Sequence, residues 1–262
     1  RRLNNALVRL DELNINYHIP LPEQPGGSCN FVAFTDSVSL EFKTTRPVEM
    51  VYTTDGSEPT LKSEVYTKPI VFTESGVLNI RSVLPSGKMC KTREIVVEKQ
   101  AFAPSKETVD VAPGLAMQVT DGMYLSSKEL ESVKEWKTSV IKDLREISSV
   151  VKSSESMRGV NQYAAIATGY VNIPEDGVYY ISSDNEEVWI DGKLLVDNGG
   201  EVKRFSRHDS SAALSKGMHE IKVVFLGHII GGWPSNWNDG SVKLRQSDSD
   251  KFVKITPDML FH

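Results

Sequence analysis

The sequence predicts an all-β protein that contains two β-sandwich domains, with a short helix at the N-terminus. Two observations predict this class: short β-prone runs separated by turn residues fill most of the chain, and two proline-containing stretches divide it. The length of 262 residues is enough for two ordinary domains, each with its own core. We therefore expect a small sandwich, then a linker, then a larger sandwich.

The first 24 residues begin with an apolar stripe at helical spacing. Leu3, Leu7, Leu10 and Leu13 fall on one helix face. The helix is expected to end near residues 20–22, because proline lacks the backbone donor that a helix needs. Since most helical stability comes from packing of such a face, the stripe requires a partner.

Residues 25–100 are predicted to form the small sandwich. Its β-prone runs have the spacing of a sandwich and are separated by turn residues. They are FVAF at 31–34, VSLEFK at 38–43, VEMVYTT at 48–54, VLNIRSVL at 77–84 and REIVVE at 93–98. Residues 101–114, which include Pro104 and Pro113, are predicted to be a linker.

Residues 115–262 are predicted to form the larger sandwich. The segment between residues 126 and 152 has apolar residues at a helical period, but its Ser, Thr and β-branched content favours strand and loop, so its structure stays open. The clearest local prediction is a hairpin, EVWI-DG-KLLV, because Asp191 and Gly192 suit the two positive-φ positions of a type I′ turn.

Charge and apolar patterning exclude some classes of partner. The net charge is −5, and acidic and basic residues are mixed along the chain without a basic stripe, so we expect no nucleic-acid partner. No apolar run is long enough to span a bilayer, so we expect no transmembrane segment. The two cysteines, Cys29 and Cys90, form either a disulfide or two buried thiols.

Three segments resemble one group of proteins. Residues 2–20, RLNNALVRLDELNINYHIP, are similar to the last barrel helix and exit segment of family 20 glycoside hydrolases, the β-N-acetylhexosaminidases. Residues 51–70, VYTTDGSEPTLKSEVYTKPI, resemble the Ig-like chitobiase/β-hexosaminidase C-terminal domain. The run GYVNIPEDGVYYISSDNEEVWIDGKLLVDNGG, followed by LSKGMHEIKVVFLG, resembles the protective-antigen-like module, a jelly-roll-type sandwich.

The order of these resemblances implies the C-terminal part of a bacterial β-N-acetylhexosaminidase. Residues 1–24 are then a remnant of the last barrel helix, and the leucine stripe is expected to pack on a catalytic barrel outside this chain. That family cleaves glycosides with an adjacent Asp-Glu pair. The adjacent pair here, Asp11-Glu12, lies on the predicted helix, which favours solvated helix charges over catalysis. We expect no catalytic residue and no enzyme activity in this chain.

Calcium is the cofactor that the resemblance to the protective-antigen-like module raises. Lectin members of that group hold Ca²⁺ with adjacent aspartates after a serine, and this sequence has Ser183, Asp184 and Asn185 there. The amide removes one charge from a hard-cation site. We therefore expect no cofactor, with calcium at Asp184 and Asn185 as the alternative to side-chain bonds that fix a turn.

A glycine- and asparagine-rich loop is the candidate carbohydrate-binding site. In it an indole face can cover a pyranose, and amide and carboxylate groups can bond its hydroxyls. The candidate residues are Trp233, Trp237, Asn236, Asn238 and Asp239. The alternative is that both indoles pack on the sandwich or on the barrel. Trp136 and Trp189 are expected in the core.

The predicted function is the noncatalytic accessory region of an exported enzyme that acts on N-acetylhexosamine-containing glycans. It would support the catalytic barrel, its expected partner, and bind glycans as a second partner. A free-standing carbohydrate-binding, lectin-like protein is the alternative. The family resemblance implies a periplasmic or cell-surface location.

Overall fold

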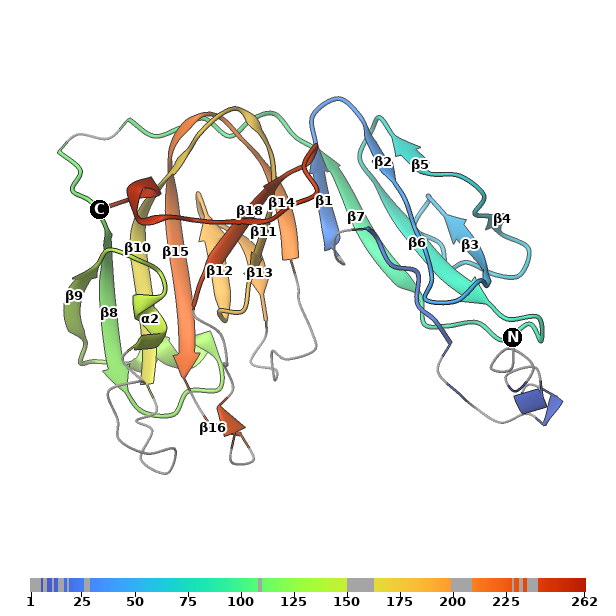
Figure 1. Ribbon diagram of the computed structural model, residues 1–262, viewed down its shortest axis with the longest axis horizontal. Helices are drawn as coiled ribbons and strands as arrows, with labels where there is room; N and C mark the ends of the chain where they lie inside the picture. The colour runs from blue at the N-terminus through green and yellow to red at the C-terminus, as the bar shows by residue number, and fades with distance from the viewer. Residues whose placement is uncertain are drawn as a thin grey trace. The chain divides into compact units, whose positions relative to one another are not determined.

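A computed structural model describes most of the chain and divides it into two compact units, Arg1–Lys99 and Gln100–His262. Both units are built mainly of β-strands, which confirms the predicted fold class (Figure 1). The described residues are 6, 9–10, 12–13, 17, 19–25, 29–107, 110–149, 163–198, 209–227, 229–230, 233–234 and 240–262.

The first unit contains the strands that the sequence predicts and two short additional ones in its described part. They are β1 (Cys29–Phe34), β2 (Val38–Leu40), β3 (Glu49–Thr53), β4 (Glu64–Val65), β5 (Ile70–Phe72), β6 (Gly76–Val83) and β7 (Arg93–Lys99). The main sheet has the order β4-β3-β6-β7-β1, and β2 pairs with β5 in a separate sheet. Alternating residues such as Leu78 and Ile80 are fully buried, so one face of each strand builds the core.

The N-terminal segment is helical where it is described. Ala6, Arg9, Leu10 and Glu12 are helical, and the backbone nitrogen of Leu13 donates to the carbonyl of Arg9 over 3.1 Å. The side chain of Leu13 is 60% exposed, so this leucine of the stripe lacks a packing partner within the described part of the chain. Leu3, Leu7 and Asp11 lie outside the described residues.

The second unit contains longer strands and, in its described part, three short helical segments. Its elements are β8 (Leu115–Asp121), η1 (Ser127–Ser132), β9 (Lys137–Ile141), α2 (Glu146–Ser149), β10 (Tyr163–Ile173), β11 (Gly177–Ser183), β12 (Glu187–Ile190), β13 (Lys193–Asp197), β14 (Asp209–Leu214), β15 (Gly217–Gly227), β16 (Ile229–Ile230), β17 (Trp233–Pro234), β18 (Val242–Gln246), β19 (Val253–Lys254), η3 (Pro257–Met259) and β20 (Leu260–Phe261).

These strands form two layers around one core. The larger layer has the order β9-β8-β10-β15-β12-β13, and the smaller one has the order β14-β11-β18-β19 (Figure 1). The layers join where Val196 of β13 pairs with Asp209 of β14. Between them, the ring of Tyr163 stacks on Phe225 at 5.3 Å between centroids, and its hydroxyl donates to the carbonyl of Ile147 over 2.7 Å. Burial raises the pKa of the Tyr163 hydroxyl.

The segment that the sequence left open divides into three short elements. Residues 126–149 form η1, then β9, then α2, so neither a long helix nor one long strand occurs there. Leu144 and Ile147, which fit the helical period, are almost completely buried in the main core. Their burial explains the period without a continuous helix.

The predicted linker is attached to the second unit. The nitrogen of Ala103 donates to the carbonyl of Ala213 over 2.9 Å, and the nitrogen of Gly114 donates to that of Leu260 over 2.9 Å. Prolines exclude a regular strand from residues 101–114, but they leave enough donors for these bonds. The segment is therefore part of the second unit's surface.

The β12–β13 hairpin confirms the predicted turn. Asp191 and Gly192 have φ angles of 48° and 74°, as a type I′ turn requires. The carboxylate of Asp191 accepts from the backbone nitrogen of Glu220 over 3.0 Å and lies 2.6 Å from Nδ1 of His219. His219 is fully buried, and its Nε2 lies 2.8 Å from the carbonyl of Ser215. The turn is thus fixed to β15.

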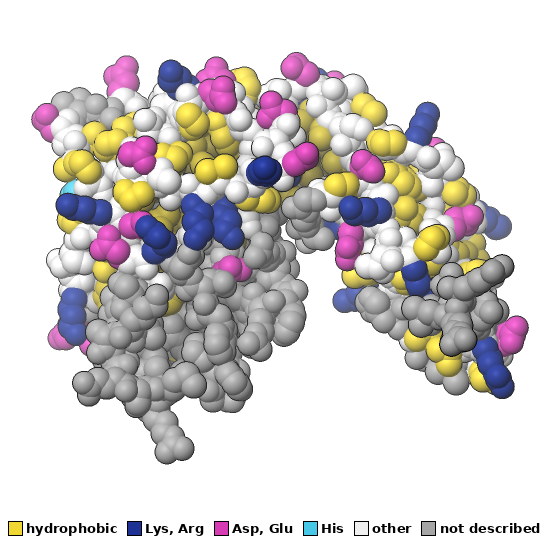
Figure 2. Space-filling model, in the orientation of Figure 1, with side chains coloured by type: hydrophobic (Ala, Val, Ile, Leu, Met, Phe, Trp, Pro, Cys, Tyr) yellow, Lys and Arg dark blue, Asp and Glu magenta, His cyan; other side chains and the backbone are white. Residues whose placement is uncertain are grey.

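Two further sequence predictions concern membrane-spanning segments and the two cysteines. No helix among them is both long and apolar enough to cross a membrane. Cys29 and Cys90 are buried free thiols rather than a disulfide. On the face that Figure 2 shows, Lys and Arg side chains lie interspersed with acidic and hydrophobic ones.

Replacement of His219 by phenylalanine tests the fixed turn. Phenylalanine keeps a ring in the cavity but removes the two ring nitrogens that face the Asp191 carboxylate and the Ser215 carbonyl. We expect the free energy of unfolding to fall by about 3 kcal/mol in denaturant titrations, since unsatisfied buried groups, charged ones above all, are costly. The control His262→Phe, at an exposed histidine, should change it by less than about 0.5 kcal/mol. Equal stability of both variants would contradict the assignment.

Candidate functional site

The loop after β11 carries a buried polar cluster. Asn185 is fully buried, and its Nδ2 donates to Oγ of Ser183 over 2.8 Å and to the carbonyl of Gly240 over 2.8 Å. The Ser183 hydroxyl in turn donates to the carbonyl of Ser241 over 3.1 Å. Asn185 therefore connects its own loop to the end of the glycine- and asparagine-rich loop, residues 229–241.

This tie unites the two candidate sites that the sequence predicted separately. Ser183 and Asn185 belong to the proposed calcium position, whereas Gly240 and Ser241 end the tryptophan-containing loop. Gly240 has a φ of 71°, and a Cβ there would lie 3.0 Å from the carbonyl of Leu144, so glycine is required. Gly240 and Ser241 are thereby held against the β11–β12 connection.

Asn198 is a member of the cluster that sequence reasoning missed. It follows the last residue of β13 and is almost completely buried. Its Nδ2 donates to the carbonyl of Ser183 over 3.2 Å and to that of Asn185 over 2.5 Å. The signal in the sequence was a polar residue directly after a strand, next to glycines, which also fits an ordinary turn.

Two acceptor atoms of this cluster have no donor. The Oδ1 atoms of Asn185 and Asn198 are buried and have no hydrogen-bond partner among the described residues. An unsatisfied buried acceptor costs about 1–3 kcal/mol, so such atoms call for an explanation. A hydroxyl or amide donor from a ligand would satisfy them.

The described part of the same cluster offers few of the oxygen ligands that a calcium ion would need. Calcium takes about six to eight oxygen ligands, with carboxylates among them. Here Oγ of Ser183 and the backbone carbonyls of Asn185 and Gly240 already accept from side-chain amide N–H groups. The carboxylates of this loop are Asp184, which is half-buried, and Glu186, which is buried. No cluster of at least three His, Cys, Asp or Glu side chains suited to a metal occurs among the described residues.

The remaining predicted binding residues are only partly placed. Trp233 pairs with Ile230 in the β16–β17 hairpin, and its side chain lies outside the described part of the chain. Asn236, Trp237, Asn238 and Asp239 also lie outside the described residues. Their place in a sugar platform therefore stays a prediction.

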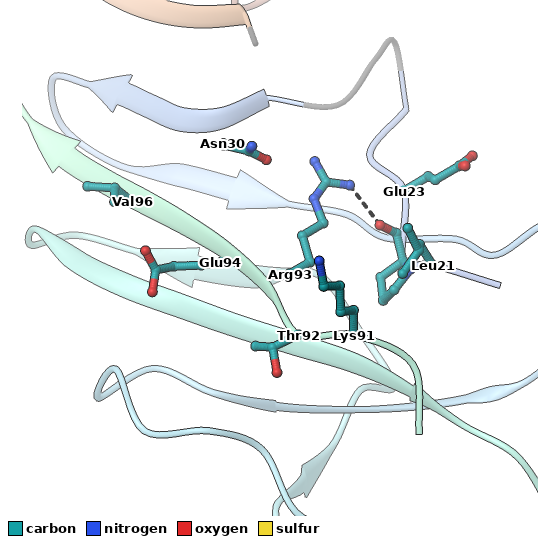
Figure 3. Close-up of a pocket in the computed structure, with 9 residues that line it drawn as sticks. Leu21, Glu23, Asn30, Lys91, Thr92, Arg93, Glu94 and Val96 are labelled. Atoms are coloured by element: carbon teal, nitrogen blue, oxygen red, sulfur yellow. Dashed lines mark hydrogen bonds between the residues drawn. The ribbon is translucent and has the colours of Figure 1, made fainter. Parts of the chain in front are cut away.

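The first unit has a hollow of about 550 Å³ between residues 21–23 and β7. Figure 3 shows Arg93 directed from β7 toward Leu21 and Glu23. Its guanidinium donates to the carbonyl of Pro22 over 2.7 Å and to Oε1 of Gln24 over 2.9 Å. Burial lowers the pKa of Arg93 from its ordinary value, which is high enough that the group stays charged. These hydrogen bonds from Arg93 thus attach residues 22–24 to the first sandwich.

Comparison with known proteins identifies two domains. The profile of the PA14 domain matches residues 119–255, and that of the chitobiase/β-hexosaminidase C-terminal domain matches residues 30–93. Both domain resemblances drawn from the sequence are therefore confirmed.

One relative matches over the whole chain. It is a β-hexosaminidase of Porphyromonas gingivalis, 49% identical over 261 residues, and the chain spans 34% of its length.

Solved structures show weaker similarity. An anti-sigma factor domain-containing protein is 10% identical with a TM-score of 0.40, and the match covers 92% of this chain and 82% of that one. The PA14 domain of the antifreeze protein MpAFP is 12% identical with a TM-score of 0.29, over 61% of this chain and 96% of that one.

Calcium titration tests the fit of the cluster. Because Asn185 stands in place of a carboxylate and several oxygens of the cluster already accept from amide donors, millimolar Ca²⁺ should leave the melting temperature unchanged, whereas an ion that binds only the folded state must raise it. Differential scanning calorimetry with and without calcium, followed by a chelator, measures this. A rise that the chelator reverses would show that the cluster holds the ion.

Proposed function

The chain belongs to the PA14 domain family, and we propose that it is the noncatalytic C-terminal accessory region of an exported β-N-acetylhexosaminidase. The observation that supports this function is the 49% identity of the entire chain to part of a β-hexosaminidase. The complete protein would act on N-acetylhexosamine-containing glycans in the periplasm or at the cell surface. This chain would support the catalytic barrel and hold the glycan near it.

Support of the barrel would run through residues 1–24. The exposed Leu13 offers apolar surface to a partner, and burying one leucine is worth roughly 1.5–3 kcal/mol. Arg93 holds the following segment through Pro22 and Gln24, so the position of the helix is linked to the first sandwich. A free-standing lectin-like protein would have no such partner for the leucine stripe, which favours the accessory role.

Glycan binding would use the cluster at the end of the second unit. The donorless Oδ1 atoms of Asn185 and Asn198 lie in the loops that hold the base of the 229–241 segment. Sugar hydroxyls supply hydrogen-bond donors in number, and the indoles of Trp233 and Trp237 would cover the apolar face of a pyranose. This binding would not need calcium.

An activity assay tests the noncatalytic role. The purified chain should not hydrolyse aryl N-acetylglucosaminides above a blank, because its adjacent carboxylate pair, Asp11-Glu12, lies in the N-terminal segment rather than at a barrel strand end. Product release is measured by absorbance. Turnover that Asp11→Asn abolishes would overturn the proposal.

Replacement of both loop tryptophans tests glycan binding. The wild-type chain should retain N-acetylhexosamine-containing glycans at a millimolar to high-micromolar level, roughly −4 to −5 kcal/mol, since one or two stacked rings supply little after association costs. Trp233→Ala with Trp237→Ala should abolish the part of the retention on a glycan array that this loop provides. The melting temperature should remain nearly unchanged.

The same variant distinguishes binding from packing. Buried indoles replaced by alanine cost about 3–5 kcal/mol each, so a large drop in melting temperature, without wild-type retention, would show that the loop is structural. Trp136→Phe is the control, because Trp136 packs against the buried cluster that contains Leu130. It should leave retention unchanged.

A further inference from the structure

A row of side chains crosses the outer face of the larger layer. Thr168 of β10, Lys222 of β15, Trp189 of β12 and Leu194 of β13 are direct partners in adjacent strands (Figure 1). Partners in register share one face of a sheet. Their chain neighbours, such as Val188 and Val223, belong to the core cluster on the other face. The row therefore faces away from the core.

Only part of this outer face is covered. Ala164, Val224 and Leu226 are buried there together with Leu130, and Trp136 packs against them. Trp189 stands beyond this cover and is half-exposed. The prediction that Trp189 lies in the core is therefore wrong: its position in the strand alternation assigns it to the outer face.

The exposed indole has a fixed orientation. Its Nε1 donates to Oε2 of Glu187 over 2.8 Å, and the other carboxylate oxygen of Glu187 accepts from the hydroxyl of Ser127. The β12–β13 register shifts between Val188 and Trp189, and such bulges redirect side chains. The amine of Lys222 lies 5.2 Å from the ring centroid. These contacts preorganise a half-exposed ring that fills no core position.

Two hollows have this ring in their lining. One has a volume of about 370 Å³ and is lined by Thr168, Trp189 and Glu220 among others. The other has a volume of about 570 Å³ and includes Glu187, Trp189 and Leu194. Lys222 lines both. Both volumes fall in the range of roughly 300–1,000 Å³ that is usual for small-ligand sites.

We propose that the outer face around Trp189 is a second binding site, which takes an uncharged oligosaccharide with one pyranose stacked on the indole. Hydroxyl groups both donate and accept, so they suit the carboxylates of Glu187 and Glu220 together with the ammonium of Lys222. The carboxylates of Glu187 and Glu220 would repel a polyanion. Two hollows that share Trp189 and Lys222 in their linings fit a chain of sugars better than a single sugar.

This site is separate from the one in the proposed function. Asn185 and Asn198 lie at the open end of the β12–β13 hairpin, whereas Trp189 lies near its closed end at Asp191-Gly192. Its residues Glu187, Trp189 and Lys222 belong to strands β12 and β15 rather than to the 229–241 loop. Each site can be removed without the other.

Isothermal titration of the full 262-residue chain with chitotetraose and with cellotetraose tests the second site. Trp189→Ala should weaken the site at Trp189 at least tenfold for whichever tetrasaccharide binds there. Trp189→Phe should keep most of the affinity, because a smaller aromatic face remains. Lys222→Met keeps the aliphatic stem but removes the ammonium, and it should weaken binding severalfold. This variant maintains the test if Trp189→Ala unfolds, which circular dichroism melts would reveal.

Control variants distinguish the Trp189 site from the 229–241 loop. Trp136→Phe should leave the affinity unchanged, and the Trp233→Ala/Trp237→Ala variant should keep the Trp189 site while losing the loop site. Unchanged affinity in both Trp189→Ala and Lys222→Met would overturn the proposal, as would the absence of binding to either sugar at millimolar concentration. If the titration gives binding heat with heparin alone, the result would instead assign this face to a polyanion. If the chain forms a dimer that Trp189→Ala dissociates, it would assign the face to self-association.

Discussion

The contact between Asp191 and His219 positions the hairpin on which both candidate binding surfaces of the second unit depend. Asp191 adopts a positive φ at the turn, and its carboxylate accepts from the backbone of Glu220 while facing the buried imidazole of His219. The imidazole in turn faces the carbonyl of Ser215. Polar groups buried this deeply stabilise one arrangement only when all of them are paired. The closed end of the hairpin is thereby fixed on β15.

The open end of the same hairpin has a different chemistry. There, the amide groups of Asn185 and Asn198 donate to carbonyl and hydroxyl oxygens of Ser183, Asn185 and Gly240, and each amide retains an acceptor without a donor among the described residues. Hydrogen bonds thus hold the cluster in place, while two of its acceptor atoms lack a donor among the described residues. An adjacent aspartate pair would bring charge to this position, whereas the amide brings donors, so the cluster favours hydroxyl ligands over a hard cation.

Two weak surfaces on one unit would act together on a glycan chain. A site built on one or two stacked rings gives modest affinity, but a second contact with the same chain becomes intramolecular, with an effective concentration set by the spacing. Such an arrangement suits an accessory region that keeps a polymer near a catalytic domain without holding each sugar tightly. The hydrogen bonds from Arg93 to Pro22 and Gln24 would link the position of that domain to the first sandwich.

Local patterns in the sequence determined the strands and the tightest turn. Short β-prone runs bounded by turn residues identified β6, β7 and β12, and Asp191-Gly192 identified the type I′ hairpin, because both signals act within a few residues. The sequence DSSAAL of β14 carries little β-propensity and was not predicted, since its burial comes from its neighbours in the sheet. Leu144 and Ile147 gave a misleading helical period, because Leu144 in the turn before α2 and Ile147 in α2 are buried in one core.

The sequence alone also indicated which residue types could bind sugar, but not where they meet. Asn185, Asn198 and Gly240 are far apart along the chain, and only the pairing of the strands brings their loops together. Trp189 has an ordinary position in a strand, and only the register with Lys222 and Leu194 shows that it faces outward beside open space. Local sequence thus determined the strands and the hairpin turn, whereas the tertiary structure decided the candidate sites, because they depend on long-range pairing that no local pattern encodes.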